Sequence, residues 1–118
     1  MAKPIKTIDY DPENDIFFIS NGDKVKASLD IGDFVLDVNH NDLVCGIEII
    51  DASENLGIAK RVLEDIKNIK MSVNYKPNHV YVLLMIAFKK EDKAVNVPIP
   101  LTLDLGHKTD KTQVLVYN

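Results

Sequence analysis

The sequence is poor in cysteine, in basic charge and in long apolar runs. Cys45 is the only cysteine among 118 residues, which excludes an intrachain disulfide, and one thiol cannot by itself frame a zinc site. A net charge of −4 and a pI near 5.2 disfavour sequence-independent binding to nucleic-acid phosphates, which needs a clustered basic surface. The longest apolar run, residues 80–88, has nine residues, whereas a membrane-spanning helix needs about 20. We therefore expect neither a nucleic-acid partner nor a membrane.

The remaining composition is that of one compact domain, residues 1–118, with 46% apolar residues to build a core. The first residues, MAKPIKTIDYD, lack the apolar segment of a secretory signal, so we expect a cytoplasmic protein. Charge is unevenly distributed: residues 1–57 carry 12 acidic and 4 basic side chains, whereas residues 58–118 carry 6 and 10. The halves could attract each other or a polar partner.

Segments rich in Val, Ile and Tyr alternate with Asn, Asp, Gly and Pro clusters, which predicts an α+β fold that is predominantly antiparallel β. We expect a first β half over residues 5–53 and a second over residues 70–118. Asn21-Gly22, between strands at 15–20 and 24–31, is typical of a type I′ hairpin turn.

One amphipathic helix is predicted between the two halves, over residues 54–69, with Ser53 as its cap. Its apolar residues share one helical face, which should pack against a sheet: Leu56, Ala59, Val62, Leu63, Ile66 and Ile69.

In the segment 94–105 every odd position from Val95 to Leu105 is apolar, which predicts a strand. Pro98 and Pro100 occupy even positions, so both missing backbone donors lie on the same side of that strand. This side is expected to be a sheet edge that resists pairing with another chain.

Three separated motifs carry a resemblance to a known family: YDPENDIFFI (10–19), FVLDV (34–38) and GIEIIDAS (46–53). Over about residues 8–53 the chain resembles the domain-of-unknown-function 2283 family, and the resemblance implies no established chemistry. Family members often have Asp-Gly in the second hairpin turn, where this chain has Asn41-Asp42.

The second half repeats features of the first, which predicts a diverged tandem duplication. LDVNHND (36–42) is similar to LDLGHKTD (103–110), so Asp37 aligns with Asp104 and His40 with His107. Two Asp/His pairs brought together by such a repeat would suit zinc or another transition metal. The alternative is that the aspartates end strands and the histidines are exposed turn residues.

The stretch DVNHNDLVCGIE (37–48) partly matches a calcium loop, but Asp42 replaces the glycine that the sharp turn needs. A tight hairpin that pairs Asp37 with Val44 would leave Glu48 about 13 Å further along the strand, at about 3.3 Å per residue. Calcium is therefore disfavoured. His79 is interpreted as a loop residue.

No Ser, Cys or Thr stands in a nucleophile motif, and no Gly-rich phosphate loop occurs. The sequence therefore predicts no enzyme and no cofactor. We expect a non-catalytic interaction module with a protein partner, present as a monomer or a homodimer. The alternatives are a protein that binds a small ligand or metal in a cavity between the two β halves, and an enzyme too diverged to recognise.

Overall fold

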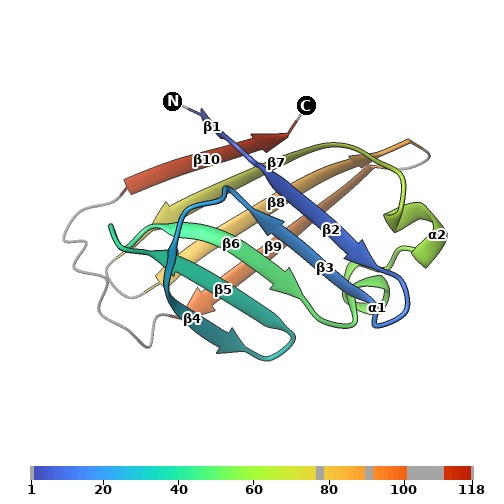
Figure 1. Cartoon of the computed structure of the whole chain (residues 1–118), viewed down its shortest axis with the longest axis horizontal. Coiled ribbons are helices and arrows are strands. Elements are labelled where there is room, and N and C mark those ends of the chain that lie inside the picture. Colours follow the sequence, from blue (N-terminus) through green and yellow to red (C-terminus); the bar gives the residue numbers. More distant parts are fainter. Residues whose placement is uncertain (1, 77–78, 90–91, 101–110, 118) are drawn as a thin grey trace.

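The computed structural model describes residues 2–76, 79–89, 92–100 and 111–117, and of residues 2, 92–100 and 111 it describes the backbone alone. Two five-stranded sheets face each other (Figure 1). The N-terminal sheet contains β2 (Thr7–Asp11), β3 (Ile16–Ser20), β4 (Val25–Ile31), β5 (Phe34–Asn39) and β6 (Val44–Ile49), in the order β2-β3-β6-β5-β4.

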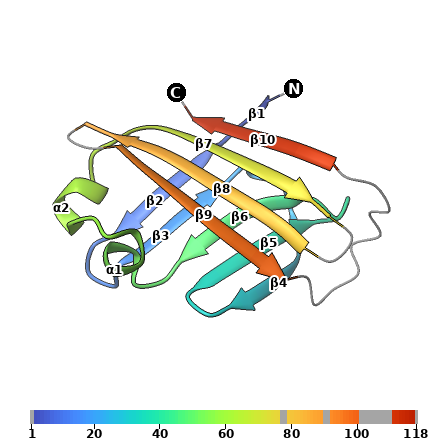
Figure 2. The same ribbon diagram turned by 180° about the vertical axis from the view of Figure 1, so that it is seen from behind.

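The C-terminal sheet contains β1 (Ala2–Pro4), β7 (Ile66–Tyr75), β8 (His79–Phe88), β9 (Asp92–Pro100) and β10 (Lys111–Tyr117), in the order β1-β10-β7-β8-β9. Neighbouring strands are antiparallel in both sheets except β1 and β10, which are parallel. This pairing brings the two ends of the chain side by side (Figures 1 and 2). The prediction of a predominantly antiparallel β protein is confirmed.

The core lies between the two sheets, because alternate residues of each strand point inward. One cluster of buried side chains includes residues from both sheets, among them Phe17, Ile19, Leu36, Ile47, Met71, Val73, Val82 and Leu84. Cys45 is also buried.

The predicted helix over residues 54–69 is wrong. The structure has two short helices instead, α1 (Ala52–Leu56) and α2 (Lys60–Leu63), at one end of the sandwich (Figure 1). Gly57 ends α1 in the left-handed conformation, with φ +66°, which glycine adopts without steric cost. Residues from Ile66 onward belong to β7, where Ile69 and every second residue up to Tyr75 are buried. None of the helices in the described part of the chain is long and apolar enough to cross a membrane.

The predicted hairpin at Asn21-Gly22 is also wrong, because β3 pairs with β2 and β6 whereas β4 pairs with β5. Residues 21–24 instead cross from one side of the sheet to the other. The Asn21 N–H donates to the Cys45 carbonyl at 2.9 Å, and its side chain holds Asp23. Gly22, at φ +87°, turns the chain out of β3.

The edge position predicted from Pro98 and Pro100 is confirmed, since β9 is the last strand of its sheet among the described residues. Residues 101–105 of the predicted strand lie outside the described residues. The predicted duplication receives no support from the topology. In the N-terminal sheet β3 lies between β2 and β6, whereas β8, its counterpart in the repeat, lies between β7 and β9. Residues 103–110, on which much of the repeat rested, lie outside the described residues.

Candidate functional site

The structure tests half of the metal site suggested by Asp37, His40, Asp104 and His107. Asp37 lies on β5, where its carboxylate accepts a hydrogen bond of 2.7 Å from Ser28 Oγ, and His40 is exposed in the turn that follows. Asp104 and His107 lie outside the described residues. Within the described ranges, no three His, Cys, Asp or Glu side chains are grouped so that they could hold a metal ion.

The predicted register of the β5–β6 hairpin is wrong by two residues. Asp37 is opposite Gly46 rather than Val44, and the pairing is irregular just after Asp37. Glu48 therefore lies only two positions beyond the residue opposite Asp37, about 7 Å along the strand rather than about 13 Å. The distance argument against calcium no longer holds, so calcium needs a direct test.

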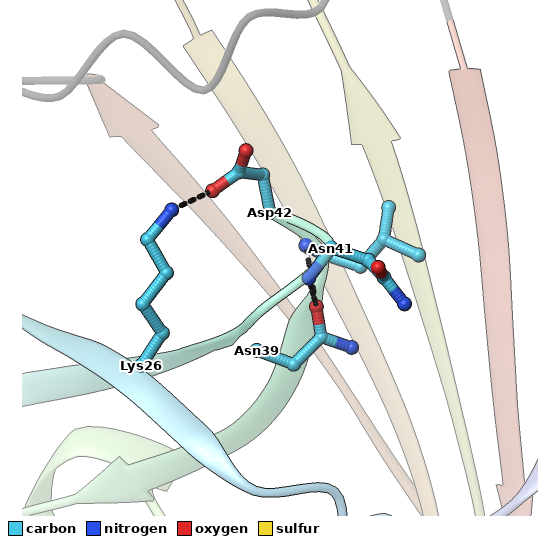
Figure 3. Close-up of polar contacts among 5 residues, drawn as sticks. Lys26, Asn39, Asn41 and Asp42 are labelled. Carbon is cyan, nitrogen blue, oxygen red and sulfur yellow. Dashed lines mark hydrogen bonds and ion pairs between the residues drawn. The ribbon is translucent and has the colours of Figure 1, made fainter.

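Asn39 causes the wider turn. Its Oδ1 accepts hydrogen bonds from the backbone N–H groups of Asn41 and Leu43, at 2.9 and 3.0 Å (Figure 3). Asp42, at φ +61°, forms an ion pair of 2.5 Å with Lys26 on β4 (Figure 3). Both contacts hold the loop in shape, which is the role expected of Asn and Asp in turns.

His40 borders a shallow depression of about 270 Å³ beside this turn. The depression mixes both charges and is lined by Lys3, Asp23, Lys24, Asn39, His40 and Asn41. The Asp23 carboxylate already accepts hydrogen bonds from Asn21 and Asn39, at 3.1 and 3.0 Å. Two lysines beside one imidazole make this a poor site for a metal cation.

The first and last motifs of the family resemblance meet in space. Tyr10 Oη donates to Asp15 Oδ1 at 2.7 Å, while the Ser53 N–H and Oγ donate to the two oxygens of the same carboxylate, at 3.0 and 2.6 Å. Asp15 thus satisfies an N–H in the first turn of α1, the role usually played by a residue of the helix itself. The Asp15 carbonyl also accepts from the N–H of Ala52. These motif residues therefore have a clear structural role.

Two opposing effects set the pKa of Asp15. Burial disfavours its charged form, but hydrogen bonds from Ser53 and Tyr10, with the nearby Lys60 charge, together hold its pKa below the ordinary value. Burial and the hydrogen bond to Asp15 raise the pKa of Tyr10. Tyr10 therefore remains a protonated donor at neutral pH.

A second polar cluster connects the two sheets inside the core. Tyr75 on β7 accepts a hydrogen bond of 2.7 Å from the Val44 N–H on β6, and it donates to Gln113 Oε1 on β10. Gln113 Nε2 donates to the Val44 carbonyl at 3.0 Å. Every polar group in this ring has a partner, so the cluster fixes how one sheet sits on the other. Sequence reasoning missed it because its members are far apart in the chain.

Cys45 follows this cluster on β6 and has little nucleophilic character. Burial, with the charges of Asp37 and Asp23, raises the pKa of its thiol to about 11. The thiolate is the reactive form of cysteine, and it is scarce at neutral pH under these conditions.

The outward face of β8 carries an unusual exposed row of side chains, which we call the β8 stripe: His79, Tyr81, Leu83 and Met85. Tyr81 and Met85 remain 40% and 47% exposed, and the rings of His79 and Tyr81 stack at 5.9 Å. Figure 2 shows this face of the C-terminal sheet toward the viewer, with both short helices at one end. His79 is therefore a strand residue and not the loop residue that the sequence indicated.

The sequence did contain a signal for the β8 stripe. The run VYVLLMIAF (80–88) is apolar at odd and even positions, so both faces of the strand had to be apolar. The pattern could not show that only one of these faces is covered by the other sheet.

A cleft of about 350 Å³ opens between the sheets beside Ile66, at the start of β7. Its walls come from both sheets and from the segment after α2, and they are formed by Lys6, Ile8, Glu64, Ile66 and Tyr117. The cleft can offer an ammonium, a carboxylate and a phenol to a small polar molecule.

Comparisons with known proteins identify relatives but no established activity. Residues 7–53 match the family described as protein of unknown function, DUF2283. A protein of Methanosarcina mazei named "Putative hypoxanthine phosphoribosyltransferase" is 33% identical over 89 residues, which are 75% of this chain and 72% of that protein. The uncharacterized protein MJ0789 of Methanocaldococcus jannaschii is 43% identical over 54 residues, 45% of this chain and 47% of that protein.

No solved structure matches the chain. The family match covers the three motifs whose first and last members meet at Asp15 and Ser53. The Methanosarcina relative extends the similarity to most of the chain. Over residues 7–53 the chain therefore resembles the DUF2283 family of proteins of unknown function, and over 89 residues it is similar to the Methanosarcina protein.

Proposed function

We propose that the protein is a non-catalytic interaction module that binds a partner protein through the β8 stripe. The observation that carries this proposal is the exposure of Tyr81 and Met85, at 40% and 47%, on one face of one strand. Aromatic residues and methionine are enriched in protein interfaces, where they supply large contact areas. Leu83 lies between them on the same face and is half-buried.

The charge beside the β8 stripe indicates what kind of partner would fit. Lys70 on β7 is directly opposite Met85, and the exposed Lys67 and Lys89 flank the same end of the β7–β8 pair. Lysines beside an apolar row favour a partner that presents apolar side chains next to carboxylates. The face is rigid, because β7 and β8 are both ten residues long and pair along most of their length.

A small-ligand protein is the second candidate, because a cleft lies between the two sheets. Its volume, about 350 Å³, is at the lower end of the range for small-molecule sites. Lys6 and Glu64 would supply the polar contacts, and Ile8 and Ile66 the apolar walls. Hypoxanthine is the natural first probe, since the name of the Methanosarcina relative contains it.

We propose no transferase activity for this protein. Transfer of a phosphoribosyl group requires tight binding of phosphates, commonly by a Gly-rich loop that leads into a helix. The described helices have five and four residues, and the sequence has no such loop. Under the proposal, the purified protein should produce no nucleotide from hypoxanthine and a phosphoribosyl donor.

The test of the interaction module compares three forms of the protein as bait in extracts of its source cells. These are the wild type, Tyr81→Ser/Met85→Ser, and a control variant at an exposed tyrosine outside the β8 stripe, Tyr117→Ser. The proposal predicts one stoichiometric partner that is retained by the wild type and the control but lost from the β8 variant. Equal retention by all three forms would overturn it. An increase in melting temperature with hypoxanthine that Glu64→Gln abolishes would support the second candidate instead.

A further inference from the structure

Among the described residues, the edge strand β4 has a neighbouring strand on one side only, so it presents a row of backbone groups on the other. β4 is the last strand of the N-terminal sheet, and β5 is its partner. Figures 1 and 2 both show β4 at the rim of its sheet. Alternate N–H and C=O groups of an edge strand point away from the sheet and can pair with another strand. Val25, at the start of β4, is 43% exposed although it is apolar.

We propose that β4 pairs antiparallel with β4 of a second copy of this chain, with Ser28 opposite Ser28 on the twofold axis. In this register residue numbers on facing positions sum to 56, so Lys26 faces Asp30 of the second copy and Asp30 faces its Lys26. Val25 faces Ile31, and Ala27 faces Leu29. Two five-stranded sheets become one continuous ten-stranded sheet.

Charge complementarity carries the choice of partner and of register. Lys26 and Asp30 lie two residues before and two residues after Ser28, and both are exposed. The twofold axis therefore creates two opposite-charge cross-strand pairs, an arrangement that stabilises a sheet. An axis on Leu29 would place Lys26 opposite Gly32 and remove both pairs. An axis on Ala27 would replace them with Asp30–Lys24 pairs, so the crosslink from Ser28→Cys distinguishes these two registers.

The apolar residues of β4 support the same register. Ala27, Leu29 and Ile31 alternate with the exposed Ser28 and Asp30 and lie on the face toward the core. Pairing about Ser28 keeps all of them on the core face of the joined sheet. An isologous contact of this kind closes after two copies, so it does not lead to fibres.

Two features of β4 oppose pairing, and neither removes the proposed contact. A bulge between Val25 and Ala27 and the lysine at position 26 are typical protections of an edge. Lys26 is the residue that the bulge leaves out of the pairing with β5, whereas Ala27–Ile31 stay in regular register, so the centre of the proposed contact at Ser28 is undistorted. Lys26 also pairs with Asp42, but both side chains are well exposed, at 47% and 35%, and such pairs exchange partners easily.

Charge reversal tests the proposal because the two single variants complement each other. Lys26→Glu alone and Asp30→Lys alone each place like charges opposite each other and should weaken the dimer at least about tenfold. In an equimolar mixture of the two, the introduced glutamate of one copy faces the introduced lysine of the other. The unchanged Asp30 of the first copy then faces the unchanged Lys26 of the second, so the mixture should dimerise like the wild type. Analytical ultracentrifugation over a concentration series measures all four samples, and circular dichroism confirms that each variant is folded.

A cysteine on the twofold axis tests the register independently. Under mild oxidation Ser28→Cys should give a disulfide-linked dimer, whereas Lys24→Cys, eight residues out of register with its own copy, should not. Cys45 is buried and does not compete. A wild-type protein that stays monomeric at every concentration would overturn the proposal, as would a dimer that both single charge reversals leave intact. Neither outcome affects the β8 stripe, which lies on the other sheet.

Discussion

Removing one oxygen atom from the buried cluster at Tyr75 should cost a large part of the protein's stability. The Tyr75 side chain is fully buried, and its hydroxyl accepts from the Val44 N–H at 2.7 Å while donating to Gln113 Oε1. Tyr75→Phe preserves the ring but leaves that N–H and that amide oxygen without this partner inside the core. Each stranded buried group costs about 1–3 kcal/mol. Because the Gln113 side chain can partly reorient, we expect the free energy of unfolding to fall by about 2–4 kcal/mol.

The hydroxyl acts in this way only while it is protonated. Burial raises the pKa of Tyr75 well above the ordinary tyrosine value, so it stays a donor throughout the useful pH range. Equilibrium unfolding in urea measures the loss. Tyr81→Phe, which removes the same atom from a side chain that is 40% exposed, is the control and should change the free energy by less than about 0.5 kcal/mol.

A double variant separates the cluster from general effects of core mutation. Gln113→Leu added to Tyr75→Phe removes the stranded amide oxygen, so the two changes together should cost less than the sum of the two single changes. If Tyr75→Phe unfolds at the same urea concentration as the wild type, the cluster does not hold the sheets together and the reasoning is wrong.

Three further predictions follow from other parts of the structure. Asp15→Asn keeps a residue that tolerates the positive φ of +55° but removes the charge, so it should cost about 1 kcal/mol at neutral pH. The folded-state pKa of Asp15 is lowered, so the carboxylate's contribution to stability is complete above pH about 4 and is lost as the pH falls through that lower pKa. The urea midpoint should therefore fall less for the variant than for the wild type between pH 7 and pH 2. An equal fall in both proteins would contradict this. Pro98→Thr/Pro100→Thr should stay folded but self-associate more by light scattering, because β9 is an edge strand, and an unchanged mass at all concentrations would contradict the edge argument. Because the described residues contain no group of three or more His, Cys, Asp or Glu side chains that could hold a metal ion, thermal melts with calcium and with chelator should coincide, and a calcium-dependent rise in melting temperature would show that the 37–48 stretch binds the ion after all.

The class of fold could be predicted from the sequence because strands bounded by turn residues give a local signal. The segment 94–105 shows this well: its alternation and its two prolines correctly placed β9 at an edge. The prediction of a helix over residues 54–69 was wrong because its last apolar residues fit both the helical period and the two-residue period of a strand. Ile66 and Ile69 continue a helical face, but Ile69, Met71 and Val73 also alternate as a strand, and pairing with β8 decided the outcome.

The order of the strands and the polar clusters depend on contacts between distant segments of the chain, which no local sequence pattern indicates. Asn21-Gly22 has the residues of a tight hairpin, but β3 pairs with β6, which is more than twenty residues away in the chain. For the same reason, the joining of Asp15 to Ser53 and of Tyr75 to Gln113 could not be foreseen. The β8 stripe was visible as an apolar run, but its exposure follows from the position of the other sheet.

Site-specific photocrosslinking in living cells tests the interaction proposal most directly. A photoreactive phenylalanine replaces Tyr81 in one strain and Tyr117 in another; both tyrosines are 40% exposed, but only Tyr81 belongs to the β8 stripe. The account predicts that illumination links the protein to one discrete partner from position 81 and not from position 117. No crosslink from position 81, or the same crosslinks from both positions, would contradict it.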